Sequence, residues 1–171
     1  MTVTSTLPIM TDNVTFTFGG KSETVQLIVV PDDRTNDLDD YVRLEDESKE
    51  PLSLRDGDVY LSKSSQLVLG IQPGDTAHVQ DSSLNVAKVK VSDISLNYLG
   101  NTLYMTQSTY ERAFGRSVRL NGIFALLKGS SADQIAFSKK LKSDGWLSIS
   151  STAEHLSLIH ISEPTRQAEI S

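Results

Sequence analysis

The apolar residues of this chain occur in runs of only strand length, and this feature limits the folds open to it. The longest runs, such as Leu27 to Val30 and Ile123 to Leu127, have four or five residues. A helix that spans a membrane needs roughly 18 consecutive apolar residues, so the chain itself is not expected to cross a bilayer. Most runs are bounded by Gly, Pro, Asp or Ser, which is typical of short strands joined by turns.

The amino-acid composition further narrows the class of protein to which the chain can belong. With 171 residues, of which 38% are hydrophobic and 22% charged, the chain can bury a sizeable core as one domain or two small lobes. The 16 basic and 22 acidic residues give a net charge of −6 without a Lys/Arg cluster, so nucleic acid is not an expected partner. The absence of cysteine excludes disulfides, thiolate metal sites and a Cys nucleophile.

The end of the chain differs in character from the rest. Residues Leu156 to Ser171 read LSLIHISEPTRQAEIS. This segment can be back-translated, through all 16 codons, into a string that resembles a transposase-based sequencing adapter with its index and flow-cell primer. We therefore expect residues 156–171 to be a read-through scar rather than native protein, with the native sequence cut at or near His155. The structural alternative is a short amphipathic helix broken by Pro164.

Strands dominate the expected first third. Val14 to Phe18 and Val25 to Val30 alternate β-forming residues around Gly19-Gly20, where positive φ is tolerated, so they are expected to pair as a hairpin. A strongly acidic stretch follows. Within it, Tyr41 to Leu44 and Pro51 to Leu54 flank a polar turn and predict a second hairpin.

The middle of the chain is expected to form a compact β-rich unit with two short helices. Each helix stops at a glycine: Ser62 to Leu69 ends before Gly70, and Thr106 to Phe114 ends before Gly115. The alternation of apolar residues slips near Ser92-Asp93, which predicts a bulge within one long strand. The strands expected here are Val59–Leu61, Thr76–Val79, Leu84–Tyr98 and Leu103–Met105.

A β-α-β pattern precedes the tail. Ile123 to Leu127 is nearly continuously apolar, as in a strand covered on both faces. Ser130 can cap a helix that runs from Ser131 through Leu141, and Trp146 to Ile149 starts a last strand. The residues by themselves therefore predict an α+β domain.

The acidic stretch is a candidate for calcium binding, because residues 31–50 hold nine acidic and three basic side chains. In an EF-hand loop that starts at Asp33, Thr35 and Asp37 would fall at the third and fifth positions. Leu38 then replaces the required Gly and Leu44 the bidentate Glu, so the signature fails. We expect a solvated loop.

Other chemical motifs are incomplete. Gly20-Lys21-Ser22 ends like a phosphate loop, but Thr15 stands where the first glycine is required and a strand follows. Triad hydrolysis would depend on His78, expected as a partly exposed strand residue, or on His155, and the chain has no G-x-S-x-G elbow. Trp146 is expected in the core. We predict no catalytic, cofactor-binding or metal-binding residues, and no enzymatic activity.

Two longer stretches of the sequence, called phrases below, say more about the family of this chain than these short motifs do. The phrase DDYVRLEDESKEPLSLRDGDVYLSKSSQLVLGIQPGDTAHVQDSS runs from Asp39 to Ser83, and ISLNYLGNTLYMTQSTYERAFG runs from Ile94 to Gly115. Over roughly Val25 to Ser150 the chain resembles the extracytoplasmic domain of FtsX-like (MacB-like) ABC transporter permeases, most of all the large versions of Gram-positive anaerobes. One departure is the short helix SKSSQLVLG, because the family usually has Lys and Ala-rich helix formers there.

The resemblance implies a fold and a role. It implies two lobes: residues 1–49 and 118–155 would form a lobe with a β-α-β unit, and residues 50–117 an inserted β-rich lobe, a small barrel or curled sheet. The domain would lie on the extracytoplasmic side of the plasma membrane, without catalytic residues or cofactors. It would handle a substrate or partner protein and be coupled to a separate ATPase subunit through transmembrane helices outside this chain. Two alternatives are a cell-surface or secreted adhesion module and a hydrolase fragment.

Overall fold

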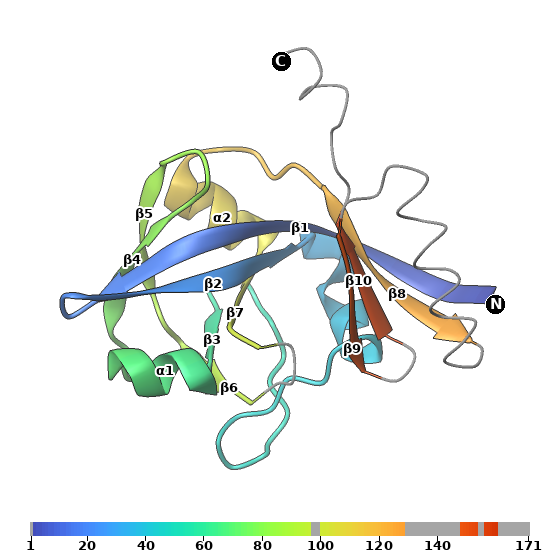
Figure 1. Ribbon diagram of the computed structural model, residues 1–171, viewed down its shortest axis with the longest axis horizontal. Coiled ribbons are helices and arrows are strands. Elements are labelled where there is room, and N and C mark those ends of the chain that lie inside the picture. Colours follow the sequence, from blue (N-terminus) through green and yellow to red (C-terminus); the bar gives the residue numbers. More distant parts are fainter. Residues whose placement is uncertain (1, 97–99, 129–147, 154–155, 161–171) are drawn as a thin grey trace. The chain divides into compact units, whose positions relative to one another are not determined.

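The computed structural model describes residues 2–96, 100–128, 148–153 and 156–160 (Figure 1). Tertiary contacts divide the chain into two compact units, one made of Met1–Pro8 and Asn121–Ser171 and the other of Ile9–Leu120. The expected inserted lobe, residues 50–117, lies within the second unit. The lobe boundaries themselves stay a prediction.

A long hairpin lies mostly in the second unit, since the first seven residues of its first strand belong to the first unit. Strand β1 (Thr2–Phe18) pairs antiparallel with β2 (Lys21–Val30), from Met10 opposite Val29 to Phe18 opposite Lys21. Gly19 and Gly20 form the turn with φ values of 58° and 78°, which suits a two-residue turn that needs positive φ at both positions. The predicted hairpin is confirmed. Strand β1 starts well before the predicted Val14, because the preceding sequence alternates too weakly to be recognised as a strand.

Five further strands complete a mixed sheet in this unit. They are β3 (Val59–Ser62), β4 (Thr76–Gln80), β5 (Val86–Lys90), β6 (Asp93–Ser95) and β7 (Thr102–Thr106). The strand order is β6-β3-β7-β2-β1, with β4 pairing β1 and β5 pairing β4. The β2–β7 and β3–β6 pairs are parallel, and the others are antiparallel.

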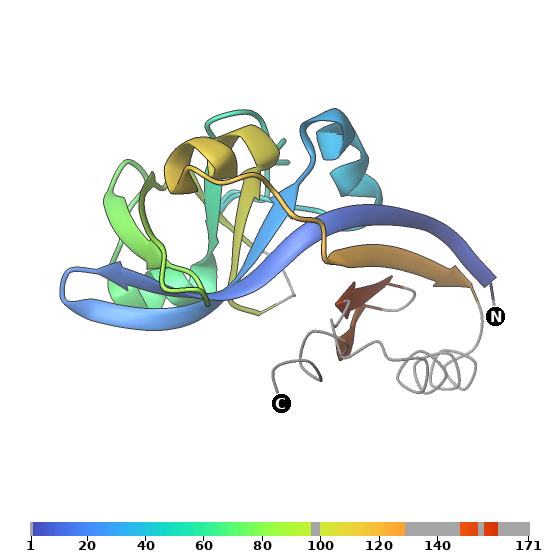
Figure 2. The same ribbon diagram turned by 90° about the horizontal axis from the view of Figure 1, so that it is seen from above.

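The hydrophobic core joins all of these strands, and the sheet curls (Figure 2). Its members come from every strand of the unit and from α1 and α2, and they include Phe16, Leu27, Leu61, Val79, Val89, Ile94, Leu103 and Tyr110. The structure therefore confirms the predicted α+β class with a curled, β-rich part.

Two α-helices follow strands directly, as predicted. Helix α1 (Lys63–Leu69) continues from β3 and ends at Gly70 with a φ of 71°, and α2 (Gln107–Phe114) continues from β7 and ends at Gly115 with a φ of 66°. The left-handed conformation at both ends explains the glycines, because a side chain is strained there. No helix in the described part of the chain is long and apolar enough to cross a membrane.

The acidic stretch contains an unpredicted 3-10 helix, η1 (Asp32–Asp40). Arg34 contacts Asp37 at 2.5 Å one turn later, and Leu38 buries its side chain against the rest of the unit. The predicted second hairpin is found only in part. An isolated antiparallel bridge joins Glu45 to Pro51, and it is flanked by hydrogen bonds from the Leu52 amide to the Leu44 carbonyl and from the Asp46 amide to the Glu50 carbonyl, both at 2.8 Å. The two segments do not extend as strands, because the polar residues between them turn back through hydrogen bonds to the Asp46 side chain.

The long strand predicted from Leu84 to Tyr98 is also wrong in its middle. Strand β5 pairs with β4, whereas β6 pairs in parallel with β3, so the chain changes partners at the place where a bulge was predicted. Ser92 marks the change, because its hydroxyl accepts a hydrogen bond from the Val59 amide at 3.0 Å and its own amide donates to the Val59 carbonyl at 2.8 Å. The slip in the alternation of apolar residues therefore marks a change of strand partner and not a bulge.

The first unit contains β8 (Gly122–Lys128), β9 (Ser148–Ala153) and β10 (Leu156–His160). Strand β10 pairs antiparallel with both β8 and β9. The predicted helix from Ser131 to Leu141 lies outside the described residues. Strand β10 consists of the first residues of the expected adapter-derived tail, and the origin of that tail stays a prediction.

Candidate functional site

Several polar groups from distant parts of the sequence converge at the start of helix α2. Thr106 ends β7 and caps α2, because its hydroxyl accepts a hydrogen bond from the Thr109 amide at 3.3 Å. The Thr109 hydroxyl lies 2.8 Å from that of Thr106 and accepts a hydrogen bond from the Gly57 amide, also at 2.8 Å. The helix is thereby joined to the turn that precedes β3.

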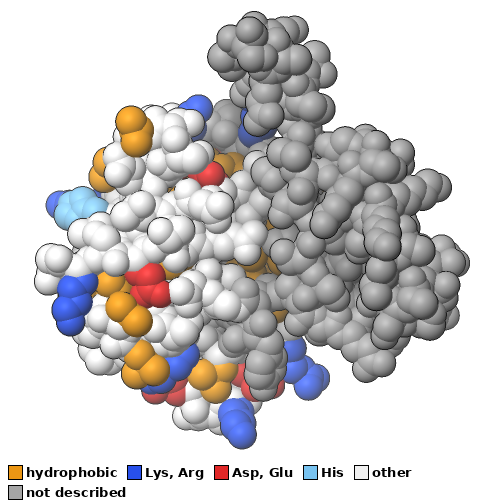
Figure 3. Space-filling model, viewed as in Figure 1, with side chains coloured by type: hydrophobic (Ala, Val, Ile, Leu, Met, Phe, Trp, Pro, Cys, Tyr) orange, Lys and Arg blue, Asp and Glu red, His pale blue; other side chains and the backbone are white. Residues whose placement is uncertain are grey.

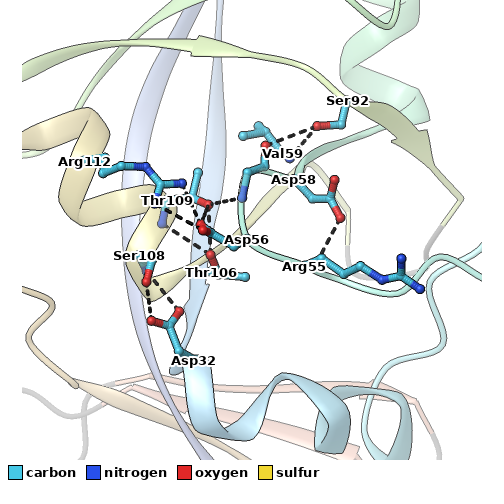
Figure 4. Close-up of polar contacts among 11 residues, drawn as sticks. Asp32, Arg55, Asp56, Asp58, Val59, Ser92, Thr106, Ser108, Thr109 and Arg112 are labelled. Carbon is cyan, nitrogen blue, oxygen red and sulfur yellow. Dashed lines mark hydrogen bonds and ion pairs between the residues drawn. The ribbon is translucent and has the colours of Figure 1, made fainter.

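Asp56, in that same turn, pairs with Arg112 one turn further along α2. The guanidinium contacts both carboxylate oxygens, at 2.6 Å and 3.2 Å, which is a bidentate geometry (Figure 4). This hydrogen bonding lowers the pKa of Asp56 and raises that of Arg112. Both side chains are exposed, so the pair fixes the orientation of Asp56 more than it adds to stability.

Asp32 connects the 3-10 helix to the same place. Its carboxylate accepts hydrogen bonds from the Ser108 amide at 3.0 Å and from the Ser108 hydroxyl, and its own amide donates to the Gln107 side chain at 3.3 Å. A carboxylate at a helix N-terminus satisfies free amides and interacts favourably with the helix dipole. Three segments distant in sequence therefore meet at the first turn of α2 (Figure 4).

A groove of about 370 Å³ lies beside this junction, between η1 and the segment of residues 53–56. Its polar lining includes Thr35, Asn36, Asp39, Arg55 and Asp56. Asp56 thus belongs both to the groove and to the α2 junction. Two carboxylates, one guanidinium and neutral hydroxyl and amide groups suit a polar ligand held by hydrogen bonds.

The visible surface of the described part carries mixed side chains. Hydrophobic, basic and acidic groups lie scattered over the face in Figure 3, without a continuous apolar area. In the part of the chain that the structure describes, no three His, Asp or Glu side chains converge as metal ligands would. This face of the described part is therefore mixed in character.

Comparison with known proteins gives structural likenesses only. No family model and no curated protein matches the sequence. Seventeen solved chains match in structure. The periplasmic region of MacB from Actinobacillus actinomycetemcomitans is 17% identical, with 99% of this chain and 77% of that chain covered at a TM-score of 0.48. The extracellular domain of the noncanonic ABC-type transporter YknZ from Gram-positive bacteria is 14% identical, with 91% and 81% covered at 0.49. At these values the likenesses do not assign the chain to a family.

The motif residues from the sequence do not converge in the structure. Gly20 lies in the β1–β2 turn and Lys21 begins β2, so the partial phosphate-loop motif is a hairpin. His78 is a strand residue on β4 opposite Lys88, as predicted, and its side chain is exposed. His155 and Trp146 lie outside the described residues.

The candidate calcium loop is a packed segment. Asp33, Thr35 and Asp37 lie in the 3-10 helix, and the two leucines that break the signature, Leu38 and Leu44, are buried at 2% and 1% exposure. The leucines therefore have a role in packing that a ligand loop would not allow.

The sequence reasoning missed the α2 junction. Nothing in the local sequence singled out Asp56 or Gly57 as part of a site, and Asp32 counted only among the nine acidic residues of the stretch 31–50. A usable signal existed in the Thr106-x-x-Thr109 spacing, which places two hydroxyls at a helix N-terminus. The partners of Thr109 outside the helix, Asp56 and Gly57, lie more than 50 residues away, and such pairing cannot be read from local sequence.

Proposed function

We propose that this chain is a non-catalytic extracytoplasmic domain of an ABC transporter permease subunit, and that it handles a substrate or partner protein outside the membrane. The proposal rests on the resemblance of the phrases between Asp39 and Gly115 to FtsX-like permease domains. A separate ATPase subunit would drive the cycle, and helices encoded beyond this chain would connect the two.

The observation that carries the proposal is the agreement between those phrases and the elements found. The phrase LGIQPGD, residues 69–75, leaves α1 through Gly70 and reaches β4, and YERAFG, residues 110–115, ends α2 at Gly115. A strand followed directly by a helix therefore occurs twice within the stretches that carry the resemblance. The expected lobes, residues 1–49 with 118–155 and residues 50–117, belong to the same proposal.

The α2 junction and its groove are the surface that we assign to recognition. Asp56 and Arg112 hold each other in place, and the neighbouring polar groups leave donors and acceptors along the groove. Recognition of this kind needs no proton transfer or nucleophile, which fits a domain that binds or guides. Its state would be changed by movements transmitted from the membrane.

Sequencing the source locus on both sides of this chain tests the proposal. We expect long apolar segments encoded upstream and downstream, an ATPase gene alongside, and a different native sequence in place of residues 156–171. Further β domains or a wall anchor instead would indicate an adhesion module. If the native gene encodes LSLIHISEPTRQAEIS followed by a stop, without membrane segments, the permease assignment and the adapter origin are both wrong.

A further inference from the structure

Strands β4 and β5 form a hairpin whose outward face carries positive charge (Figure 1). Burial alternates along both strands, so the outward residues are Thr76, His78 and Gln80 on β4 and Val86, Lys88 and Lys90 on β5. The register places Lys88 opposite His78 and Lys90 opposite Thr76. Residues directly opposite each other in an antiparallel pair share a face. The outward face of the hairpin therefore presents two ammonium groups and no carboxylate.

The neighbouring strands extend this face without adding a carboxylate. Strand β1 pairs with β4 from Thr15 opposite Gln80 to Thr17 opposite His78. The outward side chains of β1 and β2 beside this pairing carry hydroxyl or amide groups, and they are Asn13, Thr15, Thr17, Ser22, Thr24 and Gln26. Trp, Tyr and Arg, which most often anchor protein–protein interfaces, do not occur at these positions. The composition of the face favours an anionic surface over a protein partner.

The turn between β4 and β5 leads into this face with two exposed apolar side chains. Leu84 is 73% exposed and Val86 is 57% exposed. Asp81 fixes the turn, because its carboxylate accepts hydrogen bonds from the amides of Ser83 and Asn85 at 3.0 Å and 2.8 Å. The Asp81 carbonyl also accepts from the Leu84 amide at 3.0 Å. The backbone that presents the leucine is therefore held in place by the turn.

The backbone of Leu84 is strained. It adopts a φ of 69°, a left-handed conformation that hairpin loops usually give to glycine. A bulky side chain is unfavourable there, and the exposure of this leucine means that packing does not compensate for the strain. Strain of this kind is evidence for a role other than stabilising the fold.

Two carboxylates beside the turn are engaged by it. Asp12 accepts hydrogen bonds from the amide and the hydroxyl of Ser82 at 3.1 Å and 3.0 Å. Asp81 is 6% exposed and lies 3.7 Å from the guanidinium of Arg116. The loop of residues 45–50, which holds four acidic residues, lies at the lower end of this unit in Figure 1, whereas the β4–β5 turn lies at its upper end. The unit can therefore approach an anionic surface with the turn first.

From these features we infer that the β4–β5 hairpin binds an anionic lipid surface, with Leu84 and Val86 inserted among the headgroups. A strand rises about 3.3 Å per residue, which places Lys88 about 7 Å and Lys90 about 13 Å from Val86 along β5. Apolar side chains of interfacial segments reach about 5 to 10 Å into the headgroup boundary, so Lys88 would lie at the level of the phosphates. A soluble polyanion would pair with the lysines but leave Leu84 in water. The inference rests on the hairpin itself and stands apart from the proposed permease role.

Vesicle binding with an environment-sensitive dye tests the inference on the 171-residue chain. The chain has no cysteine, so Ser83→Cys gives a single attachment site beside Leu84, and Ser48→Cys gives a matched site in the acidic loop. Vesicles of phosphatidylglycerol and phosphatidylcholine at low salt should bind the chain, whereas vesicles of phosphatidylcholine alone should not. On binding, the emission of the dye at position 83 should shift to shorter wavelengths, as in an apolar environment. The emission of the dye at position 48 should not change.

Three variants separate lipid insertion from general attraction between charges. K88E/K90E should weaken binding to the anionic vesicles at least about tenfold, because the reversed charges repel the surface. Leu84→Asn should weaken it about fivefold or more and yet unfold at a higher urea concentration than the parent, since asparagine tolerates the left-handed conformation. Leu67→Asn is the matched control, because Leu67 on α1 is 70% exposed, and it should bind like the parent.

Four outcomes would overturn the inference: no binding to the anionic vesicles, binding that K88E/K90E leaves unchanged, binding without a shift in the dye at position 83, or equal losses in Leu84→Asn and Leu67→Asn. In the first case an acidic protein remains as a partner for the lysines. Sequencing of the locus bears on the permease proposal and not on this one, so the two can fail separately.

Discussion

Helices α1 and α2 begin with the same local design and use it differently. Each continues from a strand that ends in a hydroxyl residue, Ser62 or Thr106, and each ends at a left-handed glycine. Thr106 caps its own helix. The hydroxyl of Ser62 instead accepts a hydrogen bond from the Thr102 amide at 3.1 Å, at the start of β7, and donates to Ser65.

The difference shows that a Ser or Thr before a helix in the sequence does not by itself tell which amide its hydroxyl will bind. The start of helix α2 is hydrogen-bonded to two other segments, at Asp32 and at Asp56-Gly57, whereas α1 exposes Leu67 and Val68 at 70% and 54%. A hydroxyl at a strand-helix junction can stabilise either the helix or the neighbouring strand. Four substitutions, in order of decreasing effect, test whether this contrast governs stability.

Replacing Tyr110 with alanine should have the largest effect. Its side chain is 3% exposed and its ring stacks on Phe114 with centroids 4.8 Å apart. Loss of a large buried ring of this kind costs about 3 to 5 kcal/mol in the free energy of unfolding. Urea denaturation measures the change, and Leu67→Ala on α1 is the exposed control, expected within about 0.5 kcal/mol of the parent. Equal effects at the two sites would contradict the contrast between the helices.

Ser62→Ala should rank second, because it removes the acceptor of a buried amide in another element. The Thr102 amide loses its bond to Ser62, at an expected cost of about 1 to 3 kcal/mol. The measurement is the thermal unfolding midpoint followed by circular dichroism. Amide exchange should quicken at Thr102 more than within α1, and the exposed Ser117→Ala provides the control. Faster exchange confined to α1 would mean that Ser62 is an ordinary cap.

Thr106→Ala should cost about 1 kcal/mol, the usual effect of removing a helix N-cap. Thr106→Ser keeps the hydroxyl and should recover most of the stability. In this variant, unlike Ser62→Ala, the quicker exchange should fall at the Thr109 amide within the helix itself. Chemical denaturation with residue-resolved exchange distinguishes the two patterns, and a failure of serine to rescue would argue against the cap.

Arg112→Ala should have the smallest effect on stability, because its pair with Asp56 is exposed to solvent. The sign of its pH dependence is nevertheless defined. Arg112 lowers the pKa of folded Asp56, so the contribution of the pair is present at neutral pH and is lost as the pH falls below the ordinary Asp pKa of 3.8 and through the lowered value. Parent and variant should therefore converge in stability toward pH 3, as measured by unfolding at several pH values. A gap that widens on acidification would contradict this assignment.

The sequence predicted those parts of the fold that depend on neighbours in the chain. The Gly19-Gly20 hairpin and the glycine-terminated helices were predictable, since positive φ and apolar periodicity are local. The change of partners at Ser92 was not, because a slip in alternation looks alike whether a strand bulges or leaves its sheet. Helix η1 also escaped recognition, since Leu38 is the only apolar residue among its nine.

The candidate site was less predictable than the fold. Its main contacts join Asp32 to Ser108 and Asp56 to Arg112, across 76 and 56 residues. Only the folded sheet brings these residues together. The partners of β5 were equally hidden, because VAKVK, residues 86–90, alternates in the same way whether one or two strands flank it.

The β1–β2 turn offers a practical attachment point. A side-chain atom built at Gly19 or Gly20 meets nothing within 4 Å, and the flanking residues Phe18 and Lys21 already close the ladder. Tight tips in open space tolerate insertions well, provided that the inserted ends reproduce the left-handed turn. A fluorescent or affinity tag placed there would mark the chain at the end of β2 opposite to the α2 junction, and would leave that junction accessible.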